Sequence, residues 1–306
     1  MEFTRFTRQN VIANSLVVLL YLAWSFFFVG LRSDQFFLIS VYLLTFYATP
    51  RTRKFVLAFS IFIVYWIIYD SMRVFPNYLV NAVHIAQPYE IEKGLFGIYY
   101  HGVLQTPNEF FALTHTVFLD LLTGIFYLNW VPLPLMFAFY FFATGKKELF
   151  FGFALVFFIT NLIGFVIYYL YPAAPPWYYA VHGNQFIADT MGSRAGFIHF
   201  DELVGVDVFK NIYDKNANVF AAVPSLHSSY PVILLYYASK LKKPWVTICL
   251  SVFTLGIWFS AVYSGHHYII DVILGLSCAI IGIIVYNYVC RIPKVKHWLA
   301  QYAKII

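Results

Sequence analysis

Long apolar runs separated by short basic stretches constrain this chain more than any other feature of its sequence. Several of these runs approach the about 20 residues that a helix needs to cross the hydrocarbon core of a bilayer. Eight such segments can be delimited, at 11–30, 35–49, 55–75, 130–145, 149–171, 222–240, 245–263 and 268–290. Charged residues make up only 11% of the chain, whereas soluble domains contain about 25%. We therefore predict an all-α fold, a polytopic transmembrane helix bundle of about eight helices (six to eight).

The sequence does not determine at which residue the fourth apolar segment begins. An apolar stretch at 110–128 precedes it, and a break is expected at Asn129–Pro134, where Pro132 and Pro134 lack the N–H donor of a continuous helix. This stretch is either a re-entrant piece or part of a spanning helix. The apolar runs as a whole predict three regions, namely an N-terminal transmembrane hairpin at 1–54, a catalytic transmembrane bundle at 55–290 and a cytoplasmic tail at 291–306.

The distribution of Lys and Arg between the loops predicts the orientation. With eight helices and a cytoplasmic N-terminus, 14 of these residues fall on the cytoplasmic side. Five fall on the other side, and they are Arg32, Lys93, Arg194, Lys210 and Lys215. Cytoplasmic loops of membrane proteins carry such an excess, so we expect both termini in the cytoplasm. The net charge of +6 then belongs to membrane loops, and no nucleic-acid partner is expected.

Three short stretches are predicted at the opposite, non-cytosolic face. They are Tyr171-Pro-Ala-Ala-Pro-Pro-Trp177, Val223-Pro-Ser-Leu-His-Ser228 and Tyr263-Ser-Gly-His-His-Tyr-Ile-Ile-Asp271. Two long segments, 76–115 and 172–221, are too polar to cross the bilayer and are expected at the same outer face. Because loops of this length in a compact protein usually serve function, we expect the functional site there.

His267 and Asp271 are the first candidate catalytic pair. They are four residues apart, so that on a helix they lie on one face and within contact range. A carboxylate beside an imidazole orients the ring and stabilises its charged form. The opposite ring nitrogen is then left as a nucleophile or a base. An ionisable residue at the start of a membrane helix is a functional-site candidate in its own right.

The second stretch adds a phosphate-binding element. Ser225 is a possible cap of a helix whose N-terminus, with free N–H groups and a positive dipole end, favours a phosphate. His227 would lie beside that phosphate. His267 could then attack phosphorus and become phosphohistidine, while protonated His227 gives its proton to the leaving oxygen. Ser225 and the backbone amides would hold the non-bridging oxygens.

Zinc is the main alternative for these residues. His227, His267 and Asp271 could be ligands, but the sequence supplies no clear fourth ligand, so we expect no metal. His266 points about 100° away from His267 on a helix and is expected beside the site. The remaining histidines lack partner spacing and are interpreted as packing or surface residues: His84, His101, His115, His182, His199 and His297.

Charged residues before the first stretch have two interpretations. Asp70 and Arg73, three residues apart at the end of the third apolar segment, are either a structural ion pair or part of a headgroup pocket. Glu90 or Glu92 belongs either to an interfacial turn or to the same pocket.

The three stretches together resemble the type 2 phosphatidic acid phosphatase superfamily, over about residues 70 to 290. The resemblance is carried by Pro-Pro-Trp at 175–177, Pro-Ser-Leu-His-Ser at 224–228 and His-His-Tyr-x-x-Asp at 266–271. Phe220-Ala-Ala-Val-Pro-Ser-Leu-His, and Gly192-Ser-Arg-Ala-Gly196 with Asp201, are similar to its inositol phosphorylceramide synthase branch, which is known in fungi and in bacterial relatives.

This resemblance implies a lipid phosphotransferase that needs no metal and no other cofactor. His267 would be the nucleophile, Asp271 its orienting carboxylate and His227 the acid and base. Synthases of this branch move inositol phosphate from a membrane phospholipid donor, phosphatidylinositol, to a lipid alcohol acceptor, the primary hydroxyl of ceramide. The residues expected to bind substrate are Ser225, Ser228, Pro175, Trp177, Asp70, Arg73, Tyr263 and His266.

Departures from the wider superfamily pattern favour transfer over hydrolysis. No Lys or Arg lies near Pro175, Leu226 replaces a Gly, and Ala261 stands where an Arg is usual. A phosphomonoester carries nearly two negative charges at neutral pH, whereas a diester carries one. The absence of these Lys and Arg residues therefore favours a diester as the substrate. A phosphatase acting on a lipid or isoprenoid phosphate is the alternative. A transporter is disfavoured, because no matching halves are visible and the charges gather at one face.

Overall fold

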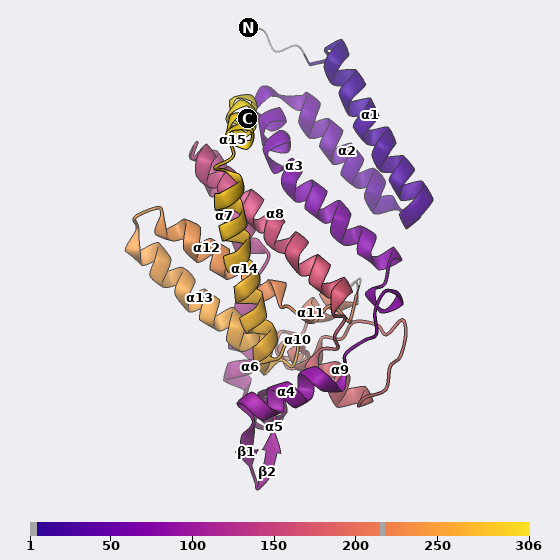
Figure 1. The fold of residues 1–306 in the computed structure, drawn as a ribbon, viewed down its shortest axis with the longest axis vertical. Coiled ribbons are helices and arrows are strands. Elements are labelled where there is room, and N and C mark those ends of the chain that lie inside the picture. Colours follow the sequence, from indigo (N-terminus) through magenta and orange to yellow (C-terminus); the bar gives the residue numbers. More distant parts are fainter. Residues whose placement is uncertain (1–4, 215–217) are drawn as a thin grey trace. The chain divides into compact units, whose positions relative to one another are not determined.

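The computed structural model describes residues 5–214 and 218–306 (Figure 1). Within these ranges the chain forms two compact units. The first contains the residues up to Phe75 together with Val289–Ile306, and the second runs from Pro76 to Tyr288. Lys215, which was counted above for the orientation, lies outside the described residues.

Three apolar helices make up most of the first unit. Helix α1 (Arg8–Trp24) continues into a π-helical turn, η1 (Ser25–Val29), and α2 (Ser33–Ala48) packs against α3 (Pro50–Ser71), which ends in a 3₁₀ turn, η2 (Met72–Val74). Thr49 caps α3 with its hydroxyl, and Pro50 occupies the first turn, where its missing N–H is not needed. The C-terminal helix α15 (Pro293–Ile305) contacts α3 through Tyr302, whose hydroxyl donates to the Leu57 carbonyl at 2.6 Å.

The second unit is built around α12 (Leu226–Ser239), which packs against α8 (Lys147–Leu170) and α13 (Pro244–Tyr263). Helix α6 (Val117–Tyr127) lies along α13, and α7 (Pro132–Ala143) packs on α8. Helix α14 (Ile269–Val289) approaches its neighbours closely at two glycines. A Cβ on Gly275 would meet the Ser225 carbonyl oxygen at 2.1 Å, and one on Gly282 would meet Thr160 Oγ1 at 2.3 Å.

The two long polar segments fold into short elements beside this bundle. The first contains η3 (Asn77–Leu79), α4 (Ala86–Phe96), α5 (Pro107–Thr114) and a small antiparallel hairpin of β1 (Ile98–Tyr100) and β2 (Val103–Gln105). The second contains α9 (Pro176–His182), η4 (Ala195–Phe197), α10 (Ile198–Val204) and α11 (Val208–Tyr213). A buried aromatic cluster holds the second segment on α6 and α13, and it includes Tyr127, Phe197, Phe209 and Ile257.

The predicted helical fold is confirmed. Each of the eight apolar segments contains a helix, and in the described residues six helical runs are long and apolar enough to cross a bilayer. The stretch left open at 110–128 contains α6, and the run Val117–Ala143, with a break before Pro132, reaches spanning length. Helices α2 and α12 are shorter, with 16 and 14 residues. The orientation and the three predicted regions stay predictions.

Candidate active site

Backbone hydrogen bonds tie the three motif stretches together in the second unit. The first stretch joins the residues just before the second, where the Ala173 N–H donates to the Phe220 carbonyl at 3.0 Å. It joins the third where the Trp177 N–H donates to the Gly265 carbonyl, also at 3.0 Å. The second joins the third where the Ser225 N–H donates to the Asp271 carbonyl at 3.0 Å. Segments far apart in sequence are thereby fixed around one point.

Ser225 caps α12, as its position before that helix predicted. Its hydroxyl oxygen accepts the backbone N–H of Ser228 at 3.3 Å and the Ser228 hydroxyl at 3.0 Å. Both serine side chains are fully buried in this cap. Their predicted contact with substrate stays a prediction, and the cap itself sets the position of His227 in the first turn of the helix.

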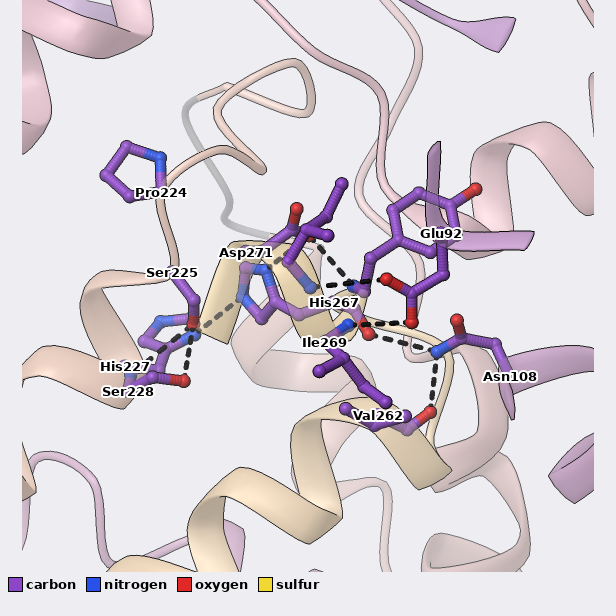
Figure 2. Close-up of polar contacts among 12 residues, drawn as sticks. Glu92, Asn108, Pro224, Ser225, His227, Ser228, Val262, His267, Ile269 and Asp271 are labelled. Carbon is purple, nitrogen blue, oxygen red and sulfur yellow. Dashed lines mark hydrogen bonds and ion pairs between the residues drawn. The ribbon is translucent and has the colours of Figure 1, made fainter. Parts of the chain in front are cut away.

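The structure brings His227, His267 and Asp271 together (Figure 2). His267 Nε2 lies 3.4 Å from His227 Nδ1, and His267 Nδ1 lies 3.4 Å from Asp271 Oδ2. Asp271 is fully buried, and its Oδ2 accepts the backbone N–H of Tyr268 at 2.9 Å. The contact between His267 and Asp271 is within ion-pair range but longer than a hydrogen bond, which is common before substrate tightens a catalytic site.

Tyr127 is a site residue that the sequence did not reveal. Its hydroxyl lies 2.7 Å from His227 Nδ1, and its side chain is fully buried on α6. The Trp130 ring lies 4.2 Å from the His227 ring on the same side of the bundle. Because aromatic residues are frequent throughout this chain, nothing local distinguishes these two from packing residues.

Glu92 and Asn108 position the start of α14. The fully buried Glu92 carboxylate accepts the backbone N–H groups of Ile269 at 2.9 Å and Ile270 at 3.2 Å. Burial raises the pKa of Glu92 to about 7, and these two hydrogen bonds oppose the shift. Asn108 Nδ2 donates to the carbonyls of Val262 and His267, at 2.7 and 2.9 Å (Figure 2). Of the two interpretations of Glu92, the structure therefore favours a place beside the site.

His266 is buried next to the site. Its Nε2 lies 3.1 Å from the Arg194 carbonyl oxygen, so this nitrogen carries the proton and donates, and its ring stacks on Tyr213 at 4.1 Å. Burial lowers the pKa of His266 to about 3, which keeps the ring neutral. This neutral ring is held by the loop of Arg194 on one side and by an aromatic ring on the other.

A small pocket of about 60 Å³ opens onto these side chains. It is lined by Pro175, Trp177, Ser193, Tyr213, Asn218, Val219, Ala221, Ala222, His227, His266 and His267. No Lys or Arg is among these lining residues, all of which belong to the described part of the chain. The nearby Arg194 is engaged elsewhere, because its Nη1 bonds Asp201 at 3.0 Å and Asp207 at 2.8 Å.

The other predicted substrate residues lie in different surroundings. The Tyr263 hydroxyl donates to Asp120 Oδ1 at 2.7 Å and accepts the Thr116 N–H at 3.1 Å. Asp70 belongs to the first unit, where it forms ion pairs with Arg73 at 3.0 Å and with Arg32. The spacing of Asp70 and Arg73 thus produces an ion pair, and their place in a headgroup pocket stays a prediction.

His115 has a partner that its sequence position did not suggest. Its Nδ1 lies 3.1 Å from Asp120 Oδ2, and its ring stacks on His199 with centroids 4.0 Å apart and planes 7° from parallel. The structure therefore gives His115 two partners, and its interpretation as a packing or surface residue stays a prediction. In the described residues, His115, Asp120 and His199 are the group whose ligand atoms gather closely enough for a metal. A metal ion binds in the plane of an imidazole, so the parallel stacked rings would have to turn to share one.

A family model described as the PAP2 superfamily matches residues 101–285, which hold all three stretches. The chain belongs to the PAP2 superfamily. The resemblance predicted from the three stretches is thereby confirmed.

The superfamily members most similar to this chain include both bacterial and fungal proteins. A phosphoinositol dihydroceramide synthase of Bacteroides thetaiotaomicron is 43% identical over 302 residues, which cover 98% of this chain and 99% of the relative. An inositol phosphorylceramide synthase of Candida albicans is 32% identical over 186 residues, 56% of this chain and 38% of the relative. The catalytic subunit of the Schizosaccharomyces pombe synthase is 25% identical over 255 residues, 81% of this chain and 57% of the relative. No solved structure matches the chain.

Proposed function

We propose that this integral membrane protein transfers inositol phosphate from phosphatidylinositol to the primary hydroxyl of ceramide or a similar lipid alcohol. The reactions for which its bacterial and fungal relatives are named support this one. Six apolar helical runs of spanning length in the described residues place it in the bilayer, where both lipids reside. The catalytic face is the non-cytosolic one, with both termini in the cytoplasm, as the Lys and Arg distribution predicts.

The charge of the catalytic pocket is the observation that carries this proposal. Among the residues that the structure describes, three histidines line it without any Lys or Arg, and the neighbouring Arg194 is paired with two aspartates. A phosphomonoester brings close to two negative charges that such a pocket does not neutralise. A phosphodiester brings only one negative charge, so it needs fewer positive groups around it. The pocket therefore suits the diester of a phospholipid better than a lipid phosphate.

The reaction then takes two displacements at phosphorus. In the first, His267 Nε2 attacks phosphorus, the bond to the diacylglycerol oxygen breaks, and His227 gives that oxygen a proton. In the second, His227 takes the proton of the acceptor hydroxyl, whose oxygen attacks phosphorus and releases His267. Asp271 stabilises the positive charge on the His267 ring while it carries the phosphoryl group.

The distance between the two imidazoles favours one nitrogen of His227 as the acid and base. A nucleophile stands about 3–3.5 Å from the atom it attacks, and an acid stands about 2.6–3.2 Å from the oxygen it protonates. The 3.4 Å between His267 Nε2 and His227 Nδ1 cannot contain both distances. His227 therefore transfers its proton through Nε2, and Tyr127 holds Nδ1 from behind at 2.7 Å.

Product analysis tests this function. Purified protein in mixed micelles is given phosphatidylinositol with a labelled inositol ring together with ceramide, and the lipids are identified by mass spectrometry. We expect labelled inositol phosphorylceramide and diacylglycerol in equal amounts, and neither with His267→Ala. Release of inorganic phosphate from phosphatidic acid or an isoprenoid phosphate, without headgroup transfer, would instead establish the phosphatase alternative.

A further inference from the structure

A second, larger pocket of about 280 Å³ adjoins the catalytic pocket. Trp177 and Ser193 line both pockets, so they form the wall between them. Ligand pockets commonly measure about 300–1,000 Å³, so this one suits a single small group rather than two acyl chains. Its position gives access to a substituent of a phosphate held between His227 and His267.

One wall of this pocket is formed by two stacked imidazoles, those of His115 and His199. Behind them lies Asp120, which is 4% exposed and accepts the Tyr263 hydroxyl on Oδ1. Its Oδ2 faces His115 Nδ1 at 3.1 Å and fixes the proton on that nitrogen, so that Nε2 of a neutral His115 is left as an acceptor. Such a buried carboxylate holding a ring in one orientation is typical of a binding site.

Aromatic residues form part of the remaining wall. Trp177, Tyr179 and Tyr268 line the pocket, and Tyr179 stacks on Tyr89 at 4.1 Å. The one lining carboxylate, Glu109, is already engaged, because it accepts the Thr106 N–H at 2.7 Å and the Tyr89 hydroxyl at 3.1 Å. The pocket thus offers aromatic surface and hydrogen-bonding groups, without a free carboxylate to hold a cation.

We propose that this pocket binds the cyclitol ring of the donor headgroup, with the edges of His115 and His199 bonding its hydroxyls. A cyclitol combines uncharged hydroxyls around its rim with apolar ring faces, which matches a wall of imidazole edges and aromatic rings. This assignment rests on the proposed transfer reaction. In this assignment His199 and His115 determine which donor lipid is bound, and they take no part in breaking the bond to phosphorus.

Substitution of His199 by Phe tests the assignment, because Phe keeps the stack on His115 and removes the hydrogen-bonding nitrogens. We expect the KM for phosphatidylinositol to rise about fivefold, the effect of one lost hydrogen bond of about 1 kcal/mol. The KM for ceramide should stay unchanged, and the preference for phosphatidylinositol over phosphatidylglycerol should fall. His182→Phe is the matched control, since His182 also contacts an aromatic ring, that of Tyr178, but lines neither pocket.

Two outcomes of these kinetics would overturn the proposal. A rise in the KM for ceramide alone would assign the pocket to the acceptor. Unchanged constants for both lipids would show that neither headgroup enters it.

A binding measurement separates this inference from the transfer reaction itself. Wild-type protein is treated with diethyl pyrocarbonate, which acylates accessible histidines, and the modification of His115 and His199 is followed by mass spectrometry. We expect inositol 1-phosphate to protect both residues and glycerol 3-phosphate to protect neither. Protection without headgroup transfer would refute only the proposed reaction, whereas transfer without protection would refute only the cyclitol pocket.

Discussion

Adjacent histidines in this protein have different chemistry because their surroundings differ. His266 donates to a backbone carbonyl and is stacked on Tyr213. Burial lowers the pKa of its ring and keeps it neutral. His267, the next residue, faces His227 with one nitrogen and Asp271 with the other. The spacing of His267 and Asp271 by four residues distinguished the two histidines in the sequence. In the structure His267 lies just before α14 rather than on it, and the contact with Asp271 still forms.

Removal of either proposed catalytic imidazole should abolish turnover without unfolding the protein. We expect His267→Ala to lower kcat at least about 10,000-fold, because the nucleophile is lost. His227→Ala should lower it about 100- to 10,000-fold, the usual contribution of an acid and base. Headgroup transfer in micelles measures kcat, and circular dichroism with size-exclusion chromatography checks the fold. His297→Ala, on the exposed face of α15, is the control. Near-normal turnover in either variant would contradict the mechanism.

Site residues that act through distant partners could not be found from the sequence. Tyr127 is 100 positions from His227, Asn108 is 159 from His267, and Glu92 is 177 from Ile269. None of these residues has a helical or motif spacing to the group that it contacts. Only the packing of α4, α5 and α6 against the three stretches brings them into place.

At the scale of elements, the start of α14 depends on a carboxylate from another helix. Glu92 on α4 bonds the first two N–H groups of α14, which otherwise lack partners within their helix. The same turn carries His267 and Asp271. An element that looks local in the sequence is therefore capped by a residue of the first long polar segment.

Glu92→Gln should weaken this cap and remove a pH dependence. Glutamine offers one acceptor oxygen instead of two, so we expect kcat to fall about tenfold through a displaced His267. Burial raises the pKa of Glu92 from 4.5 to about 7. Its contribution to stability is therefore full below about pH 4.5 and is lost as the pH rises towards 7. The thermal midpoint in detergent should fall over this window more steeply for wild type than for the variant.

Glu90→Gln is the matched control for this measurement, because Glu90 lies on the same helix with an exposed side chain. Identical pH profiles for wild type and Glu92→Gln would show that Glu92 does not titrate in this range. Unchanged kcat in Glu92→Gln would show that the cap does not position His267.

A glycine on α14 sets the separation between the two proposed catalytic helices. A Cβ at position 275 would lie 2.1 Å from the Ser225 carbonyl oxygen, which is backbone and cannot move aside freely. We expect Gly275→Ala to destabilise the protein by about 1–3 kcal/mol and to lower kcat, since it pushes Ser225 and His227 away from His267. Thermal unfolding in detergent and headgroup transfer measure the two effects. Gly94→Ala, where a Cβ meets nothing within 4 Å, should leave both unchanged.

At the scale of the whole molecule, the apolar runs were sufficient to predict the helical membrane fold. They did so because a helix is the one element that satisfies all its own backbone groups in lipid. The short elements of the two polar segments, such as the β1–β2 hairpin, were not predicted. Their positions depend on contacts with the bundle, such as the aromatic cluster around Phe197 and Phe209, rather than on a periodic pattern in the sequence.

The predicted orientation can be tested with C-terminal fusions in a bacterial host. With both termini in the cytoplasm, green fluorescent protein should fluoresce and alkaline phosphatase should be inactive, because the latter needs the oxidising periplasm for its disulfides. An active phosphatase fusion would reverse the orientation and move the proposed catalytic face to the cytosol. The expectation follows from the excess of Lys and Arg in the loops assigned to the cytoplasm.

The contact between Asp271 and Nδ1 leaves Nε2 as the one nitrogen of His267 that faces His227. The phosphoryl group reaches this nitrogen by one in-line attack and leaves it by a second. Each attack inverts the configuration at phosphorus. Two inversions restore the original handedness, whereas direct attack of the alcohol on the donor would leave a mirror-image centre. A donor made stereochemically pure at phosphorus by sulfur substitution should therefore yield a sphingolipid of retained configuration, which phosphorus NMR can read.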